Sequence, residues 1–167
     1  MKIEAREIIL FGVLGGLLSA SQIALSFIPN IEIITFLIIL FSMIYRKKAL
    51  YIVWVFVMIM GFVYGFGLWW LGYLILWPLL SIFTCSIMEF INGKYLTLAI
   101  YSGIFGFLFG FFYAIPYAIF GGLNAGIVYW IAGIQFDMIH GIGNYFIMLL
   151  LGEKVFDLLN KLNSRYF

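Results

Sequence analysis

The chain has 167 residues, of which 66% are hydrophobic and only 10% are charged, and its formal net charge is +2. A mean hydropathy of +1.17 excludes an ordinary soluble domain and favours an integral membrane protein. The apolar stretches are continuous rather than alternating, which excludes a transmembrane barrel and leaves helices, because helices satisfy their own backbone in lipid. We therefore predict an all-α integral membrane protein, with residues 1–167 as a single membrane domain.

Six apolar segments follow one another along the chain, at 8–28, 33–45, 49–64, 70–91, 96–118 and 137–159. Polar or glycine-containing breaks separate the first five segments, at 29–32, 46–48, 65–68 and 92–94. The second and third segments are shorter than the ~20 residues of a perpendicular span, so we expect them to be tilted or buried. Residues 121–135 are too apolar for a solvated loop and too interrupted for a span. They predict a short helical or re-entrant cap before the last helix.

The basic residues predict the orientation of these segments. They lie before the first segment and after the second, fourth and sixth, at Lys2, Arg6, Arg46, Lys47, Lys48, Lys94, Lys154, Lys161 and Arg165. Six spans place all of them on one side of the membrane, whereas five or seven spans would scatter them. Since loops rich in Lys and Arg stay inside, we predict six transmembrane helices with both termini cytoplasmic.

The start of the chain does not favour a cleaved signal peptide. Residues 17–22 imitate a small-residue cleavage site after an apolar stretch, but Glu4 and Glu7 interrupt the basic segment that should precede it. We therefore expect the first apolar segment to remain in the protein.

The stretch QFDMIHGIGNYF at 135–146 gathers polar side chains in an apolar background. Asp137, the only histidine, His140, and Asn144 lie within about 60° of one another on a helix face. Asp137 is also suited to cap the N-terminus of the last helix. His140 and Asn144 lie about one and two turns deeper. There, polar residues indicate either a functional site or a hydrogen bond between helices.

Aromatic residues gather on the side of the membrane that holds no Lys or Arg. Four of the five tryptophans and three tyrosines lie on or near this outer side: Trp69, Trp70, Trp77, Trp130, Tyr73, Tyr117 and Tyr129. An interfacial belt is an alternative for Trp69 and Trp70, but a belt should mark both interfaces. A one-sided cluster beside Glu32 and Asp137 is typical of a pocket for a flat polar molecule, which needs stacking faces and a few hydrogen-bonding groups.

Small residues recur at every fourth position of the first segment, at Gly12, Gly16, Ala20 and Ala24. Such a stripe lets another helix approach closely, either a helix of this protein or one of a partner. In the fifth segment, Gly103, Gly106 and Gly110 form a similar pattern, which we interpret as internal packing.

The remaining patterns exclude several classes of function. The chain has no nucleotide-binding loop, no nucleophile elbow and no cluster of metal ligands. We therefore expect no catalytic residues, no metal, no cofactor, no enzymatic activity and no nucleic-acid partner. The single Cys85 is expected to pack in an apolar run, and Glu89 is expected to be an interfacial charge. The chain is also too short for the inverted repeats of most secondary transporters, which suggests a binding subunit that depends on partners for energy.

Three stretches carry a resemblance in the same order along the chain. FIPNIEIITFLIILFSMIYRKKAL at 27–50 places Pro-Asn before a polar residue and a threonine. GFGLWW at 65–70 is similar to a Gly-x-Gly-x-Trp-Thr loop, with Trp70 at the polar position. IQFDMIHGIGNYF at 134–146 has Asp, then His, then Gly-Asn. Together with six short helices, these stretches resemble the substrate-specific (S) components of energy-coupling factor (ECF) transporters, which are vitamin-uptake modules of prokaryotic plasma membranes.

The resemblance implies a site and a set of partners. With the residue patterns above, it predicts a substrate pocket formed by Asn30, Glu32, Thr35, Trp69, Trp70, Tyr73, Trp77, Tyr117, Trp130, Asp137, His140 and Asn144. It implies that Gly12, Gly16 and Ala20 dock onto the membrane-embedded T subunit, with glycine where the family usually has alanine. Two ATPase subunits and the T subunit would then topple the S component in the bilayer. The family's substrates include riboflavin, thiamine, biotin, folate, cobalamin and pantothenate, and the sequence does not choose among them.

Two other classes of function stay open at this point. One is a small intramembrane enzyme that uses Asp137 and His140 to activate water. The other is a structural membrane protein with an ordinary aromatic belt. Turnover by the purified protein would favour the enzyme, and the absence of a tight small-molecule ligand would favour the structural protein.

Overall fold

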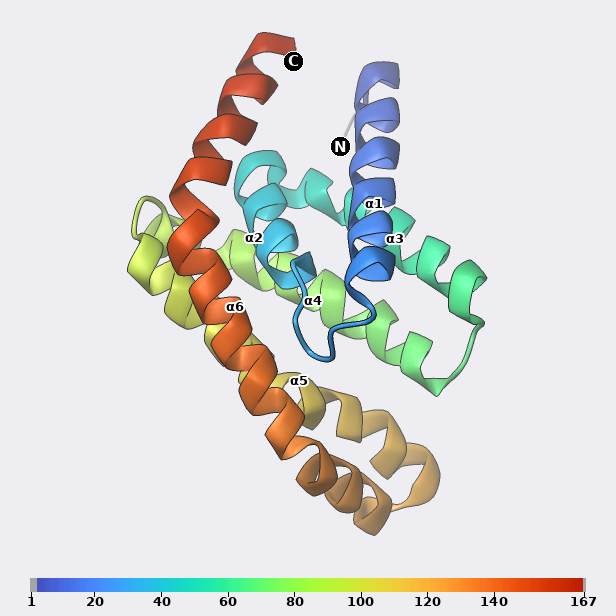
Figure 1. The fold of residues 1–167 in the computed structure, drawn as a ribbon. Coiled ribbons are helices and arrows are strands. Elements are labelled where there is room, and N and C mark those ends of the chain that lie inside the picture. Colours follow the sequence, from blue (N-terminus) through green and yellow to red (C-terminus); the bar gives the residue numbers. More distant parts are fainter. Residues whose placement is uncertain (1–2, 167) are drawn as a thin grey trace.

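The computed structural model of the protein describes residues 3–166 and is 90% helical, with no strand in this range. The described residues form six α-helices and one turn of 3-10 helix: α1 (Ala5–Leu25), α2 (Ile34–Tyr45), η1 (Arg46–Lys48), α3 (Ala49–Tyr64), α4 (Leu68–Ile91), α5 (Tyr95–Gly121) and α6 (Leu123–Tyr166). Figure 1 shows how the six α-helices are arranged. The all-α expectation is confirmed. The breaks predicted at 29–32, 46–48, 65–68 and 92–94 each coincide with an interruption between two helices.

Four helical segments in the described part of the chain are long and apolar enough to cross a membrane: Ala5–Leu25, Ile34–Tyr64, Leu68–Ile91 and Tyr95–Gly121. The second of these comprises α2, η1 and α3, which together span 31 residues. These long apolar helices are consistent with a multi-pass membrane protein. Six spans with both termini in the cytoplasm remain a prediction.

The short helix α2 lies at the centre of the molecule (Figure 1). Its ten residues from 34 to 43 are all buried, including the polar Thr35 and Ser42. A helix that is apolar on every side is stable only when other elements surround it. The Ser42 hydroxyl donates to the Ser81 hydroxyl of α4 at 2.8 Å. Burial among neighbours therefore explains how a helix of only 12 residues is accommodated, as the sequence predicted for this segment.

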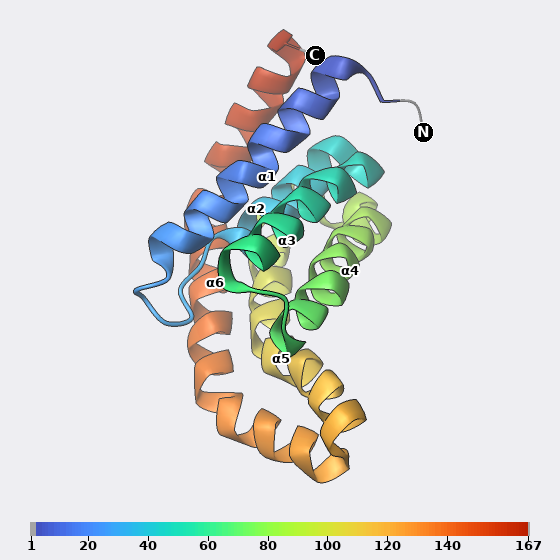
Figure 2. The same cartoon turned by 90° about the vertical axis from the view of Figure 1, so that its right-hand side faces the viewer.

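Helices α5 and α6 form an antiparallel hairpin with very close backbone contact (Figure 2). A Cβ atom added at Gly106 would lie 2.7 Å from the Cα of Gly141, and one added at Gly103 would lie 3.1 Å from the Cβ of Tyr145. A Cβ atom at Gly110 would overlap the carboxylate of Asp137. The internal packing predicted for these three α5 glycines is confirmed. We call this contact the glycine seam.

The separate cap expected at 121–135 is not formed, because Gly121 ends α5 and residues 123–135 are the first part of α6. Only Gly122, with φ of +87°, interrupts the chain between α5 and α6, and glycine tolerates this left-handed backbone. The helix starts at Leu123 and continues for 44 residues, and Figure 2 shows that it bends after its first turns. Packing against α5 compensates for the helix-weakening glycines, since Gly126 lies directly against Ala118. The interpretation of Asp137 as an N-cap residue is therefore wrong.

The basic turns of the chain gather at one end of the molecule. The Lys48 ammonium forms an ion pair with Glu7 in the first turns of α1, and the Arg46 guanidinium contacts the Met88 sulfur near the end of α4. The start of α1 and the end of α6 lie at the same end of the molecule in both views (Figures 1 and 2). Lys2 lies outside the described residues.

Candidate functional site

A cavity of about 480 Å³ lies between the α1–α2 loop, the end of α3, and helices α4, α5 and α6. It is at the far end of α1 from the basic turns, and a volume of this size suits a small molecule. Its lining residues are Gln22, Leu25, Ser26, Ile28, Pro29, Asn30, Ile31, Glu32, Met60, Tyr64, Trp69, Tyr73, Trp77, Phe109 and His140. Six of the predicted pocket residues are among them: Asn30, Glu32, Trp69, Tyr73, Trp77 and His140.

The α1–α2 loop brings Glu32 to this cavity. Asn30 has φ of +58°, a left-handed backbone that asparagine tolerates better than most residues, and this turn directs the chain back into the molecule. The Glu32 carboxylate then accepts the backbone N–H groups of Ile34 and Thr35, the latter at 2.8 Å. A carboxylate is favourable here, because the first N–H groups of α2 have no partner within the helix. The start of α2 therefore holds the Glu32 side chain in place.

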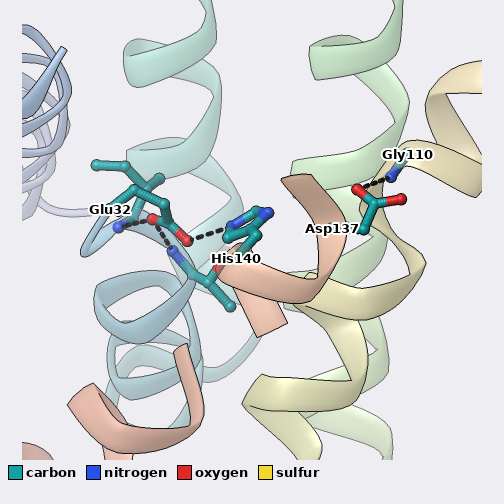
Figure 3. A network of polar contacts seen from close by, with 6 residues as sticks. Glu32, Gly110, Asp137 and His140 are labelled. Atoms are coloured by element: carbon teal, nitrogen blue, oxygen red, sulfur yellow. Dashed lines mark hydrogen bonds and ion pairs between the residues drawn. The ribbon is translucent and has the colours of Figure 1, made fainter. Parts of the chain in front are cut away.

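The second oxygen of Glu32 meets the imidazole of His140 on α6, at 2.9 Å from Nε2 (Figure 3). Both side chains are almost completely buried. Burial alone would raise the pKa of Glu32, but the hydrogen bonds from His140 and Thr35 outweigh it and hold the pKa below the ordinary value of 4.5. Glu32 is therefore an ionised carboxylate at the cavity wall at neutral pH.

Aromatic rings form another part of the cavity wall. Trp69, Tyr73 and Trp77 lie four residues apart and share one face of α4. Their rings meet edge to face, with centroids 5.2 Å apart for Trp69 and Tyr73 and 5.5 Å for Tyr73 and Trp77. Tyr64 extends this row from the end of α3, with its ring centroid 6.4 Å from that of Trp69. We call these four residues the aromatic row. The Phe109 ring of α5 lies 4.8 Å from the His140 ring and closes the wall between them.

The polar stripe of α6 divides between two neighbours. His140 points to Glu32, whereas Asp137 points to α5 and accepts the N–H of Gly110 at 2.9 Å (Figure 3). Asp137 therefore contributes to the glycine seam and does not line the cavity. The hydrogen bonds of Asp137 and His140 thus go to different partners, Gly110 and Glu32. Asn144 is 1% exposed, and its amide has no hydrogen-bond partner among the described residues.

The other predicted pocket residues also lie outside the cavity lining. Thr35 is fully buried in the first turn of α2. Trp70 faces α3 instead, because its indole N–H donates to the Val57 carbonyl at 2.9 Å. Tyr117 stacks on Tyr129 at a centroid distance of 4.1 Å, and Trp130 meets Phe111 edge to face at 5.4 Å. These aromatic pairs belong to the hairpin of α5 and α6.

The sequence interpretation missed several residues that line the cavity. Tyr64 is an aromatic residue immediately before the predicted break at 65–68, so its position next to the site could have been found. Gln22 is the only amide side chain in the first apolar segment, so it also gave a signal. Phe109 gave none, because many phenylalanines in α5 look alike in the sequence.

The glycine stripe of α1 differs from the seam of α5. An added Cβ atom at Gly12 or Gly16 would meet nothing within 4 Å, and Gly12 and Ala20 are exposed. Gly15, beside them, faces inward, where a Cβ atom would lie 2.6 Å from the Val55 side chain. The stripe is therefore an open, smooth face on the surface of α1.

The groups that line the cavity are suited to binding a small molecule. No group of three or more His, Cys, Asp or Glu residues in the described part of the chain could hold a metal ion. What the cavity offers is a buried carboxylate–imidazole pair, several backbone and amide groups, and aromatic surfaces, a combination that favours binding and orienting a small molecule. No protein-family model matches this chain, and comparisons with curated proteins and with solved structures found no similar protein.

Proposed function

We propose that this protein is the substrate-binding S component of an ECF-type importer, which captures a vitamin or related micronutrient at the outer face of the plasma membrane. One observation carries the proposal: a cavity lined by both the Glu32–His140 pair and the aromatic row lies away from the basic end of the molecule. Burying a polar pair in an apolar helical protein costs stability, so the presence of such a pair is a reason to assign it a function. Recognition of a ligand is such a function.

The loop and helices that surround the cavity support the same proposal. The resemblance noted in the sequence involves the stretches at 27–50, 65–70 and 134–146, and each contributes at least one residue to the cavity: Glu32, Trp69 and His140. Residues far apart in the chain thus meet where a ligand is expected. The open stripe on α1 is suited to close approach by a helix of the T subunit.

The proposed mechanism divides the work between the protein and its partners. The S component binds the substrate through the cavity, whereas two ATPase subunits and the T subunit supply the energy for uptake. In this scheme the glycine seam keeps α5 and α6 together as a unit, so that the cavity moves with the protein when it topples. The protein itself carries out no chemical step.

The direct test is to purify the protein in detergent and identify by mass spectrometry any small molecule that co-purifies with it. We expect one vitamin-like compound in near-stoichiometric amount, and quenching of tryptophan fluorescence when that compound is added back to ligand-free protein. Trp69→Leu should weaken the binding, because Trp69 lines the cavity. The matched control is Trp130→Leu, since Trp130 contacts Phe111 away from the cavity.

Two results would contradict the proposal. If no small molecule co-purifies and none of the family's substrates binds, a structural membrane protein becomes the better interpretation. If the purified protein converts a compound without partner subunits, the enzyme hypothesis gains support.

A further inference from the structure

We infer that the substrate is a flat, positively charged or amine-bearing aromatic molecule, and that the cavity discriminates against anions. This inference rests on the proposed function, because it names the class of molecule that the same cavity takes. It comes from the charges and ring surfaces that line the cavity, which favour one sign of ligand charge.

Among the described residues that line the cavity there is no lysine or arginine. Between Lys48 and Lys154 the chain has only one lysine or arginine, Lys94. Lys94 lies between α4 and α5, directly after the end of α4 that is remote from Trp69. A carboxylate or phosphate ligand would thus enter a largely apolar site without a Lys or Arg partner, and leaving a charge unpaired in such a site is costly.

The only carboxylate in the lining is Glu32, and its position is fixed. One of its oxygens accepts two backbone N–H groups of α2, and the other meets His140. The Glu32–His140 pair has a net charge of −1 if the imidazole is neutral and 0 if it is protonated, so it is never positive. The pair therefore attracts a cation or leaves it unaffected, and it does not attract an anion.

The aromatic row supplies the second half of the selectivity. The faces of aromatic rings are negative, so a cation within about 6 Å of a ring centroid is attracted to it, most strongly by tryptophan. Trp69 and Trp77 both line the cavity with Tyr64 and Tyr73 between and beside them. A flat ligand can place its rings against this row and its positive charge between the row and Glu32. An uncharged analogue would keep the contact area and lose the attraction.

The test compares three water-soluble two-ring probes of similar size by isothermal titration calorimetry on the purified protein. They are 1-methylquinolinium (cationic), quinoline (neutral) and quinoline-4-carboxylate (anionic), each corrected by a titration into empty detergent micelles. We expect the cation to bind about 30-fold more tightly than quinoline, the ratio for a desolvated cation–π contact. The anion should show no measurable binding.

Two variants test whether Glu32 and the aromatic row cause the preference for the cationic probe. Glu32→Gln keeps an oxygen for the α2 N–H groups but removes the negative charge, and it should reduce the advantage of the cation over quinoline about tenfold. Trp69→Leu keeps an apolar surface but removes a ring face. It should therefore lower the affinity for 1-methylquinolinium more than the affinity for quinoline. Trp130→Leu, away from the cavity, should change neither affinity. If Glu32→Gln does not fold, Trp69→Leu tests the ring surface on its own.

The outcomes separate this inference from the proposed function. If the molecule that co-purifies is an anion, or if quinoline-4-carboxylate binds as tightly as 1-methylquinolinium, the inference is wrong while the proposed function stands. If a molecule co-purifies and the cation is preferred, both are supported. If nothing co-purifies and no probe binds, the proposed function fails and the inference fails with it.

Discussion

The two sides of α6 show how one short polar stripe can serve two purposes. On the side facing α5, the backbones touch at Gly106 and Gly141, and Asp137 fills the remaining space by accepting the Gly110 N–H. On the side facing the α1–α2 loop, His140 and Glu32 stand at the wall of a cavity. Asp137 and His140 are separated by only about 60° around the helix. The width of a polar stripe in a sequence is therefore no guide to the width of a site.

The largest effect that tests this difference between the two sides of α6 is expected from a substitution that forces the glycine seam apart. We expect Gly106→Val to destabilise the protein by about 3 kcal/mol, because its Cβ atom would lie 2.7 Å from the Cα of Gly141, and a backbone atom cannot move aside cheaply. The measurement is the thermal unfolding midpoint in detergent. Gly12→Val is the matched control, because a Cβ atom there meets nothing within 4 Å.

If Gly106→Val lowers the unfolding midpoint no more than Gly12→Val does, the described contact between α5 and α6 is contradicted. The cavity side of α6 should also respond, since His140 adjoins Gly141 in the chain. We therefore expect ligand affinity to fall in Gly106→Val along with stability. A variant that lost only affinity would indicate that the two sides are not held together by the seam.

Removing Asp137 tests the seam more gently. Asp137→Ala deletes the side chain that accepts the Gly110 N–H, and a hydrogen bond of this kind contributes ~0.5–1.5 kcal/mol, so we expect a loss of about 1 kcal/mol. Ligand affinity should stay the same, because Asp137 does not line the cavity. Chemical or thermal unfolding and a binding titration measure the two effects separately. Asp157→Ala, at an exposed position of α6, is the control. A large loss of affinity in Asp137→Ala would return Asp137 to the binding site.

Acidification tests the cavity side. The pKa of Glu32 is below 4.5 in the folded protein, because its hydrogen bonds to His140 and Thr35 outweigh the effect of burial. A carboxylate of this kind contributes stability above its unfolded pKa and loses it as the pH falls through the folded value. We expect unfolding midpoints to decline below about pH 4.5. The decline should be smaller in Glu32→Gln, which has no carboxylate at this position to protonate. Equal declines in both proteins would assign the acid sensitivity to other carboxylates.

Much of the fold could be predicted because the lengths of the apolar segments, and the polar or glycine-containing breaks between them, are local properties of the sequence. The breaks at 46–48 and 92–94 contain charged residues that an apolar helix excludes, and the structure interrupts its helices there. The error at 121–135 has a physical cause as well. Gly126 and Gly133 suggest an irregular segment, but the close contact of Gly126 with Ala118 stabilises a helix that local propensity alone disfavours.

The site was less predictable, because the position of a residue on a helix face does not reveal which neighbouring helix its side chain contacts. Glu32 and His140 are 108 residues apart in the chain, and only the arrangement of α2 beside α6 brings them together. Trp69 and Trp70 are adjacent and identical, yet one lines the cavity and the other donates to Val57 on α3. Of the seven aromatic residues expected to gather at the outer side, only three of α4 line the cavity, Trp69, Tyr73 and Trp77, and the sequence could not choose between the two adjacent tryptophans.

The smallest expected effect on the isolated protein concerns the stripe of α1, and it sharpens the contrast with the glycine seam. Gly12→Leu and Gly16→Leu should change the free energy of unfolding by no more than about 0.5 kcal/mol, because these positions face open space. Binding of the substrate by the solitary protein should also be retained. Under the proposed function, however, the added side chains would hold a partner helix away, so co-purification with the T and ATPase subunits, and uptake, should be lost. The matched control is Gly15→Leu, which should destabilise the protein itself, since Gly15 lies against Val55. If assembly survives both substitutions, the open stripe of α1 is not where the partner docks.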